Sequence, residues 1–321
     1  MRVAILGAGG VGGYFGGLLA RGGHEVRLLA RGPHLKAIRN RGLEVRTPEE
    51  TFITHPFATD DPGELGVVDV VFVAVKAYSL QEVAPVAAEL ARSRSAASED
   101  TEAGVAEPGA IAPGAIVIPF LNGVDAVQEL QAAGVPGDRL LPGLTYISAT
   151  RTAPGVVERR SEFQRIRLGT SSERAQAICQ ALRGVGVDAE TSPDIQVELW
   201  RKFIFLTAFS AVCGLTRTDI GTVREATLGL DLLGQAVREI AAVGRACGIS
   251  LPSDAEADAL ALLESLPPTL KPSFLRDVEA GGPNELDILS GAVARKGREV
   301  GVPTPLHDTA TFVLGMAPPR G

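Results

Sequence analysis

Lys202 is the side chain in this sequence best suited to acid–base chemistry. It lies within 198–206, a mostly apolar stretch, and lysine occurs only five times among the 31 basic residues. Burial disfavours the charged form of an amine, so a partly desolvated lysine becomes a better proton donor near neutral pH. The same pattern fits a lysine whose stem lies along the edge of a buried helix while its ammonium reaches water. Composition alone leaves both interpretations of Lys202 open.

Ser273 and Glu285 form a second candidate pair, in the C-terminal part of the chain. The joint Gly281-Gly282-Pro283 lies between them, and such a joint is expected to bring the end of one helix to the start of the next. Ser273 and Glu285 would then lie near one point. Alternatively, Glu285 interacts with the N-terminal dipole of its own helix, expected at 286–300.

The glycine-rich turn near the N-terminus is suited to binding a dinucleotide. An apolar segment at 2–6 leads into Gly7-Ala8-Gly9-Gly10-Val11-Gly12, where a helix is expected to begin. In this spacing, Gly7 permits a sharp turn, Gly9 lets the backbone approach a pyrophosphate and Gly12 lets the helix pack closely on the strand. The free N–H groups of the helix start face the phosphate charge. The pattern favours a dinucleotide site over a purely structural turn.

Arg31 indicates which dinucleotide is bound. It follows the second expected strand, at 24–30. An NAD-binding unit usually has Asp or Glu there for the ribose 2′-hydroxyl, and FAD-binding units also prefer an acid. A guanidinium suits a 2′-phosphate, so the sequence favours NADP(H). The alternative is a solvated arginine at a strand end.

Two further polar residues follow buried strands. The segment 67–75 is apolar apart from one acid, as expected of a parallel strand covered on both faces, and Lys76 follows it. Asn122 follows the next such strand, at 115–121. Ligands of doubly wound sheets bind at the carboxyl ends of strands, so Lys76 and Asn122 are candidate ligand contacts.

The order of the elements predicts two domains. Strands and helices alternate up to residue 191, which indicates an α/β fold: an NADP-binding Rossmann-type domain at 1–191. The segment 192–321 shows helical periodicity and is expected to be an all-α substrate and dimerisation domain. A flexible surface loop is expected at about 92–113, from its Ser, Ala, Glu, Gly and Pro content. The expected helices of the second domain are 195–212, 220–247 and 286–300.

Composition argues against several classes of function. The net charge of −7 comes from 38 acidic and 31 basic residues spread along the chain, so no basic patch indicates a nucleic-acid or membrane partner. No apolar run reaches the roughly 20 residues that span a bilayer. The N-terminus does not resemble a signal peptide, so we expect a cytoplasmic protein. The three cysteines and four histidines lack metal-like spacing, so no metal is expected and the cysteines are interpreted as small buried side chains.

Taken together, the motifs resemble those of the ketopantoate reductases (2-dehydropantoate 2-reductases). The resemblance covers nearly the whole chain, and the order and spacing of the motifs are far more specific than any single one. The matching segments are the glycine motif at 7–12, Arg31, Lys76, Asn122-Gly123, Lys202, Ser273–Asp277, Asn284–Asp287 and Gly301–Pro305.

The resemblance implies NADPH-dependent reduction of the ketone of 2-dehydropantoate to (R)-pantoate, a step toward pantothenate and coenzyme A. It implies that Lys202 is the general acid that protonates the carbonyl oxygen. Glu285 would hydrogen-bond the reacting hydroxyl or the cofactor. The other implied contacts are Asn122 with nicotinamide and substrate, Ser273 with the substrate carboxylate, and Arg31 and Lys76 with the cofactor.

One departure from the family pattern concerns the substrate. Family members commonly carry asparagines four and eight residues after the lysine to hold the substrate's hydroxyl, whereas this chain has Leu206 and Ser210. Losing a buried hydrogen bond costs about 1–3 kcal/mol, enough to change which 2-oxo acid is preferred.

Three functions therefore stay under consideration. A reductase of ketopantoate is favoured, a reductase of another 2-oxo acid is the first alternative, and an NADP-binding regulator without turnover is the second. A regulator needs none of Lys202, Ser273 and Glu285, so the presence of all three argues against a regulator. The long apolar helices of the second domain favour a homodimer.

Overall fold

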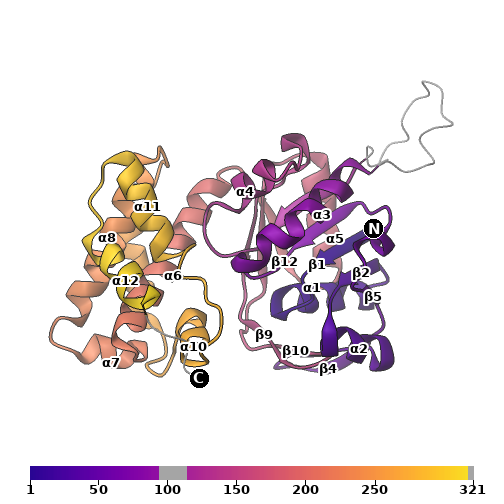
Figure 1. The fold of residues 1–321 in the computed structure, drawn as a ribbon, viewed down its shortest axis with the longest axis horizontal. Coiled ribbons are helices and arrows are strands. Elements are labelled where there is room, and N and C mark those ends of the chain that lie inside the picture. Colours follow the sequence, from indigo (N-terminus) through magenta and orange to yellow (C-terminus); the bar gives the residue numbers. More distant parts are fainter. Residues whose placement is uncertain (94–113, 317–321) are drawn as a thin grey trace. The chain divides into compact units, whose positions relative to one another are not determined.

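The computed structural model describes residues 1–93 and 114–316, which form two compact units (Figure 1). Each unit has its own hydrophobic core. The short segment 122–125 belongs by its contacts to the second unit, although residues on either side of it belong to the first. The first unit comprises 1–121 and 126–195, and the second comprises 122–125 and 196 onward.

The loop expected at about 92–113 lies almost entirely outside the described residues. Arg92 is the last residue of a helix and Ser93 follows it as the helix cap.

A five-stranded parallel sheet lies at the centre of the first unit. Its strands are shorter than the sequence predicted, because only the central residues of the apolar segments 67–75 and 115–121 pair with their neighbours. Side chains alternate across the sheet: Val3 and Ile5 pack in one core cluster and Ala4 in another. In spatial order the strands are β5 (Phe57–Thr59), β2 (Glu25–Leu29), β1 (Arg2–Leu6), β6 (Val70–Val73) and β7 (Ile116–Pro119).

Helices cover both faces of this sheet, as expected for a parallel sheet (Figure 1). α1 (Gly10–Arg21) buries Tyr14, Phe15 and Leu19 on the face that carries Val3 and Ile5. The opposite face is covered by α3 (Leu80–Arg92) and α4 (Ala126–Ala132). α2 (Gly32–Arg41) follows β2.

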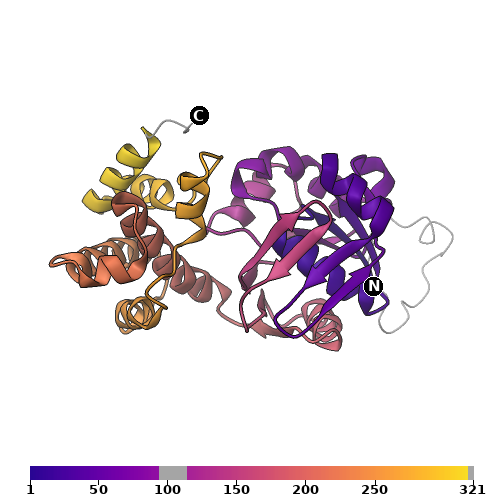
Figure 2. The same cartoon turned by 90° about the horizontal axis from the view of Figure 1, so that it is seen from below.

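The remaining strands of the first unit form two smaller sheets rather than extending the parallel one. Figure 2 shows the pink hairpin of β9 and β10 beside the purple strands β3 and β4. One sheet contains β4 (Thr51–Thr54), β3 (Leu43–Arg46), β10 (Val156–Arg159) and β9 (Ala149–Ala153); the other contains β12 (Asp188–Ser192), β11 (Arg165–Gly169) and β8 (Gly143–Tyr146), which α5 (Glu173–Gly184) covers.

The second unit is helical. The long helix α6 supplies much of its core, including Trp200 and Phe203, and α8 packs against several of the other helices. The helices are α6 (Ile195–Thr216), α7 (Ile220–Glu225), α8 (Gly229–Ala246), α9 (Ala255–Ser265), α10 (Ser273–Glu279), α11 (Ser290–Val300) and α12 (Pro305–Gly315).

Helix boundaries in this unit differ from the sequence prediction. The single helix expected at 220–247 is two helices, α7 and α8. The chain turns back tightly between them, and a Cβ on Gly229 would lie 1.6 Å from the carbonyl oxygen of Val223. α11 begins at Ser290, several residues later than expected. α10 precedes the glycine joint, where the sequence predicted the end of a helix, whereas α9 and α12 were not predicted.

α6 also differs from the expectation that no segment is long and apolar enough to cross a bilayer. By length and composition this helix passes such a test, but 61% of its most apolar window is buried inside the fold. That degree of burial is typical of the core helix of a globular unit.

Candidate active site and cofactor site

The glycine motif forms a tight turn between β1 and α1. Gly7 has a φ of +101°, a conformation that side-chain-bearing residues rarely adopt. A Cβ on Gly12 would lie 2.1 Å from the carbonyl oxygen of Gly7, so glycine is needed for the helix to pack against the turn. A Cβ on Gly9 would meet nothing within 4 Å, so the backbone there borders open space. These features fit a pyrophosphate lying against the turn.

The start of α1 is free to face an anion. Gly9 is the N-cap, and the N–H of Gly13 donates to its carbonyl oxygen over 2.8 Å, so the preceding N–H groups have no acceptor within the helix. The first turn of α1 contains no acidic side chain. The positive end of the helix dipole therefore faces the turn without an internal counter-charge.

Gly10 is required by packing. A Cβ at this position would lie 2.3 Å from the carbonyl oxygen of Ala149, in β9. Sequence reasoning did not identify this contact, because it joins residues far apart in the chain.

Strand register places Arg31 and Lys76 on the same edge as the glycine turn. Leu6, the last residue of β1, pairs with Leu29 of β2 and with Val73 of β6. The sequence order of the strands reverses at β1, which is the switch point where doubly wound sheets bind ligands. The segments that follow β1, β2 and β6 therefore leave the sheet side by side.

Arg31 forms an ion pair across this edge. Its Nη1 lies 2.7 Å from Oε1 of Glu82, in the first turn of α3. The pair raises the pKa of Arg31 and lowers the pKa of Glu82. Both side chains are exposed, 66% for Arg31 and 55% for Glu82, so the guanidinium is accessible to a ligand.

His34 holds the glycine turn in place, a role that sequence reasoning missed. Its ring is buried, with Nε2 2.7 Å from the carbonyl oxygen of Ala8 and Nδ1 accepting from the N–H of Gly155 over 2.8 Å. Nε2 must therefore carry the proton. Burial lowers the pKa of His34, which keeps the ring neutral.

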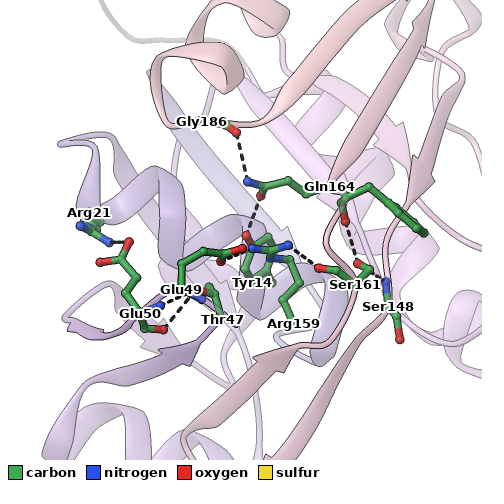
Figure 3. A network of polar contacts seen from close by, with 11 residues as sticks. Tyr14, Arg21, Thr47, Glu49, Glu50, Ser148, Arg159, Ser161, Gln164 and Gly186 are labelled. Atoms are coloured by element: carbon green, nitrogen blue, oxygen red, sulfur yellow. Dashed lines mark hydrogen bonds and ion pairs between the residues drawn. The ribbon is translucent and has the colours of Figure 1, made fainter.

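A partly buried polar network anchors the body of α1 (Figure 3). The guanidinium of Arg159, in β10, is paired with Glu49 and lies 5.9 Å from the ring centre of Tyr14. The Tyr14 hydroxyl donates to Gln164 over 2.6 Å. This network ties α1 to the β3–β4 turn and to the segment before β11.

In the second unit, Asn122, Lys202 and Glu285 lie together. Asn122 Nδ2 donates to Glu285 Oε2 over 3.2 Å, and Glu285 is only 4% exposed. Burial lowers the pKa of the half-buried Lys202 to about 8, and the negative charge of Glu285 opposes part of that shift. Both sequence interpretations of Lys202 placed it near buried surface, and its depressed pKa favours the proton donor.

Asn122 is held by the residues that follow it. Gly123 has a φ of +90°, and a Cβ there would lie 3.2 Å from the carbonyl oxygen of Ile288. Asp125 pairs with Lys296 of α11 over 2.5 Å. These contacts attach the segment 122–125 to the loop that carries Glu285 and to the helix after it.

The structure corrects the helix start expected near Glu285, whereas the proximity of Ser273 and Glu285 stays a prediction. Ser273 is the first residue of α10, at the far end of that helix from the glycine joint. The proposed dipole interaction of Glu285 is also wrong, because α11 begins at Ser290 with Leu289 as its N-cap. Turns follow the glycine joint at 286–289. Within them, the N–H of Leu286 donates to Oδ1 of Asn284 over 3.1 Å.

The positions that carry asparagine in the resembling family lie along α6. Leu206 is half-buried, and Ser210 is 2% exposed. Among the described residues, the hydroxyls of Ser210 and its neighbour Thr207 have no hydrogen-bond partner. Buried hydroxyls without a partner are unusual, so Thr207 and Ser210 are exceptions to the rule for core side chains.

The cysteines do not form a reactive site. Cys179 and Cys213 are buried, and burial raises their pKa values, that of Cys213 to about 12. Cys247 is exposed, contrary to the expectation that all three are buried, because it caps the C-terminal end of α8. Within residues 1–93 and 114–316, no group of three or more potential metal ligands lies together.

Comparison with known proteins identifies matches along the whole chain. The family model "Ketopantoate reductase PanE/ApbA" matches residues 3–173, and the model of the C-terminal domain of the same family matches 194–316. An uncharacterised oxidoreductase, YkpB of Bacillus subtilis, is 28% identical over 320 residues, which cover 98% of each chain. A 2-dehydropantoate 2-reductase of Halobacterium salinarum is 28% identical over 323 residues, covering 99% of each chain.

Solved structures show the same architecture. A PanE/ApbA family ketopantoate reductase from Ralstonia eutropha superposes with a TM-score of 0.86 at 27% identity, covering 99% of this chain and 98% of that one. A D-mandelate dehydrogenase, solved with NADH and anilino(oxo)acetate, superposes with a TM-score of 0.82 at 23% identity, covering 98% and 97%. At that identity the second likeness concerns the fold alone.

Proposed function

We propose that this chain, which belongs to the ketopantoate reductase family of oxidoreductases acting on CH–OH groups, reduces 2-dehydropantoate to (R)-pantoate with NADPH. The reaction would serve pantothenate and coenzyme A biosynthesis. The observation that carries the proposal is the lysine of depressed pKa beside a buried carboxylate, on a chain matched by the family over nearly its full length.

Lys202 is the proposed proton donor to the ketone oxygen. With a pKa of about 8, its ammonium is mostly protonated at neutral pH and yet releases its proton far more readily than an ordinary lysine. Glu285 keeps that ammonium charged in a half-buried setting, and Asn122 orients the Glu285 carboxylate. When bound, the nicotinamide supplies the hydride that reduces the carbonyl carbon.

The proposed cofactor contacts lie in the first unit. The turn residues Gly7, Ala8, Gly9, Gly10, Val11 and Gly12 would hold the pyrophosphate, because the backbone at Gly9 is open and the start of α1 has no internal counter-charge. Arg31 would bind the 2′-phosphate and Lys76 would contact the nucleotide from the neighbouring strand end. In the second unit, Asn122 and Glu285 would contact the nicotinamide end of the cofactor.

The proposed substrate is a small 2-oxo acid. Ser273 would bind its carboxylate, and Leu206 and Ser210 would shape the pocket for the rest of the molecule. Because family members commonly have asparagine where this chain has Leu206 and Ser210, a 2-oxo acid that lacks the hydroxyl of ketopantoate is the second candidate substrate.

A substrate panel tests the proposal. Purified protein is mixed with NADPH and, separately, with ketopantoate and with branched and aromatic 2-oxo acids, and the loss of NADPH absorbance is followed. We expect the highest kcat/KM with ketopantoate. A higher value with an acid that lacks the hydroxyl would replace the proposed substrate by the second candidate, and NADPH binding without oxidation of any acid would contradict a reductase.

We also propose a homodimer located in the cytoplasm. The exposed apolar side chains Phe312, Val313 and Met316 near the end of α12 support self-association. Light scattering after gel filtration measures the mass directly, and a mass of one chain would contradict the dimer.

A further inference from the structure

The ion pair between Arg31 and Glu82 spans the strand at the centre of the cofactor site. Arg31 follows β2 and Glu82 lies in the first turn of α3, which follows β6. β2 and β6 are the two neighbours of β1, and all three strands end at the same level. The pair therefore lies next to the glycine turn, where the adenosine half of a dinucleotide enters.

The pair can be replaced by a ligand. The 2.7 Å contact between Arg31 Nη1 and Glu82 Oε1 is made by two side chains that are 66% and 55% exposed. Exposed ion pairs contribute little to stability, so exchanging one anionic partner of Arg31 for another costs little. Carboxylates and phosphates also occupy the same donor fork of a guanidinium.

We propose that Glu82 competes with the 2′-phosphate for Arg31 and thereby lowers the preference of this chain for NADPH over NADH. The inference rests on the proposed cofactor site. An approaching 2′-phosphate must displace the Glu82 carboxylate from the guanidinium and then remain near a like charge. NADH carries no 2′-phosphate, so its binding leaves the pair intact, and Glu82 is a specificity-determining residue that favours NADH relative to NADPH.

The test measures the Kd of each nucleotide directly, by fluorescence or calorimetry, in the absence of substrate. Glu82→Gln removes the charge while keeping the shape of the side chain. We expect the Kd for NADPH to fall about fivefold and the Kd for NADH to change less than twofold. The matched control is Glu89→Gln, which removes an exposed charge from α3 two turns further along and should change neither Kd by as much as twofold.

Arg31→Ala separates this inference from the proposed cofactor site. We expect this variant to raise the Kd for NADPH at least tenfold more than the Kd for NADH. In the Arg31→Ala background, we expect Glu82→Gln to change the Kd for NADPH less than twofold. If Arg31→Ala behaves so but Glu82→Gln alone leaves the NADPH affinity unchanged, or weakens it, the competition is refuted while the cofactor site stands. If the unaltered protein binds neither nucleotide, both are refuted.

Discussion

At the scale of single residues, the proposed chemistry depends on one lysine and the carboxylate near it. Burial favours the neutral form of the Lys202 amine, and the negative charge of Glu285 favours the charged form. The result is a pKa of about 8, which suits a group that must be protonated at neutral pH and still give up its proton. The residue type and its apolar neighbours were visible in the sequence, but the partner was not.

Lys202→Ala should lower kcat with the best 2-oxo acid by about 100-fold or more, because the carbonyl oxygen loses its proton donor. In the unaltered protein, kcat/KM should fall as the pH rises through about 8, since deprotonation of Lys202 removes the acid. Steady-state rates across the pH range measure both effects. Arg201→Ala is the control, because it removes the exposed cation next to Lys202 that pairs with Asp258. Equal rates in the two variants would exclude Lys202 as the acid.

Glu285→Gln should move the alkaline limb of the same pH profile to lower pH. Removing a negative charge destabilises the nearby ammonium, so the pKa of Lys202 falls further below its ordinary value. Asn122 retains a hydrogen-bond acceptor in this variant, because the glutamine carbonyl oxygen replaces Oε2. A midpoint that stays in place or rises would show that Glu285 does not act on Lys202 through its charge.

At the scale of elements, the glycine turn is held from outside by the ring of His34. This side chain connects the turn, through Ala8, to the β9–β10 hairpin, through Gly155. The motif spacing predicted the turn correctly as a local structure. It contained no information about β9 and β10, which lie more than a hundred residues away and still determine why His34 is needed.

His34→Ala should lower the free energy of unfolding by about 1–3 kcal/mol, because two buried backbone groups lose their partners. The pKa of His34 is lowered in the folded state, so its contribution is complete at high pH. The contribution declines as the pH falls below about 6.5, where the unfolded chain takes up the proton first. Urea unfolding at several pH values measures this, with the exposed His55→Ala as control. A pH dependence in His34→Ala as steep as in the unaltered protein would contradict this account.

At the scale of the whole molecule, the chain passes between the two units more than once. It contributes the segment 122–125 to the helical unit, returns to the first unit at 126 and enters the helical unit again after 195. Asn122 therefore follows a strand of one unit and belongs by its contacts to the other. The sequence predicted a single boundary after residue 191, which cannot describe such a segment.

Asp125→Asn should raise the KM for the 2-oxo acid about tenfold, a change of about 1.4 kcal/mol. Asp125 is 19% exposed and pairs with Lys296, so its loss loosens the segment that carries Asn122. The Kd for NADPH should depend less on this segment, because most proposed contacts of the nucleotide lie in the first unit. The comparison variant is Asp287→Asn, since Asp287 pairs with Arg295 but is 88% exposed. Identical KM values in both variants would remove Asp125 as a positioning residue.

The sequence by itself determined the parts of this protein whose signals are local. The glycine motif, the apolar strands and the placement of a lysine in an apolar helix all depend on neighbouring residues, and the structure shows them at or near their expected positions. The order of these motifs was enough to identify the family, because order along a chain is itself a sequence property.

Only the tertiary structure decided which distant residues meet. The contacts of Asn122 with Glu285, of Arg31 with Glu82 and of His34 with the β9–β10 hairpin join segments separated by many residues. Such contacts depend on how strands and helices pack, and packing is non-local: the same local pattern is compatible with many partners. Helix boundaries after residue 220 were mispredicted for the same reason, since the close approach of Gly229 to Val223 is a property of the packed core rather than of the residues between them.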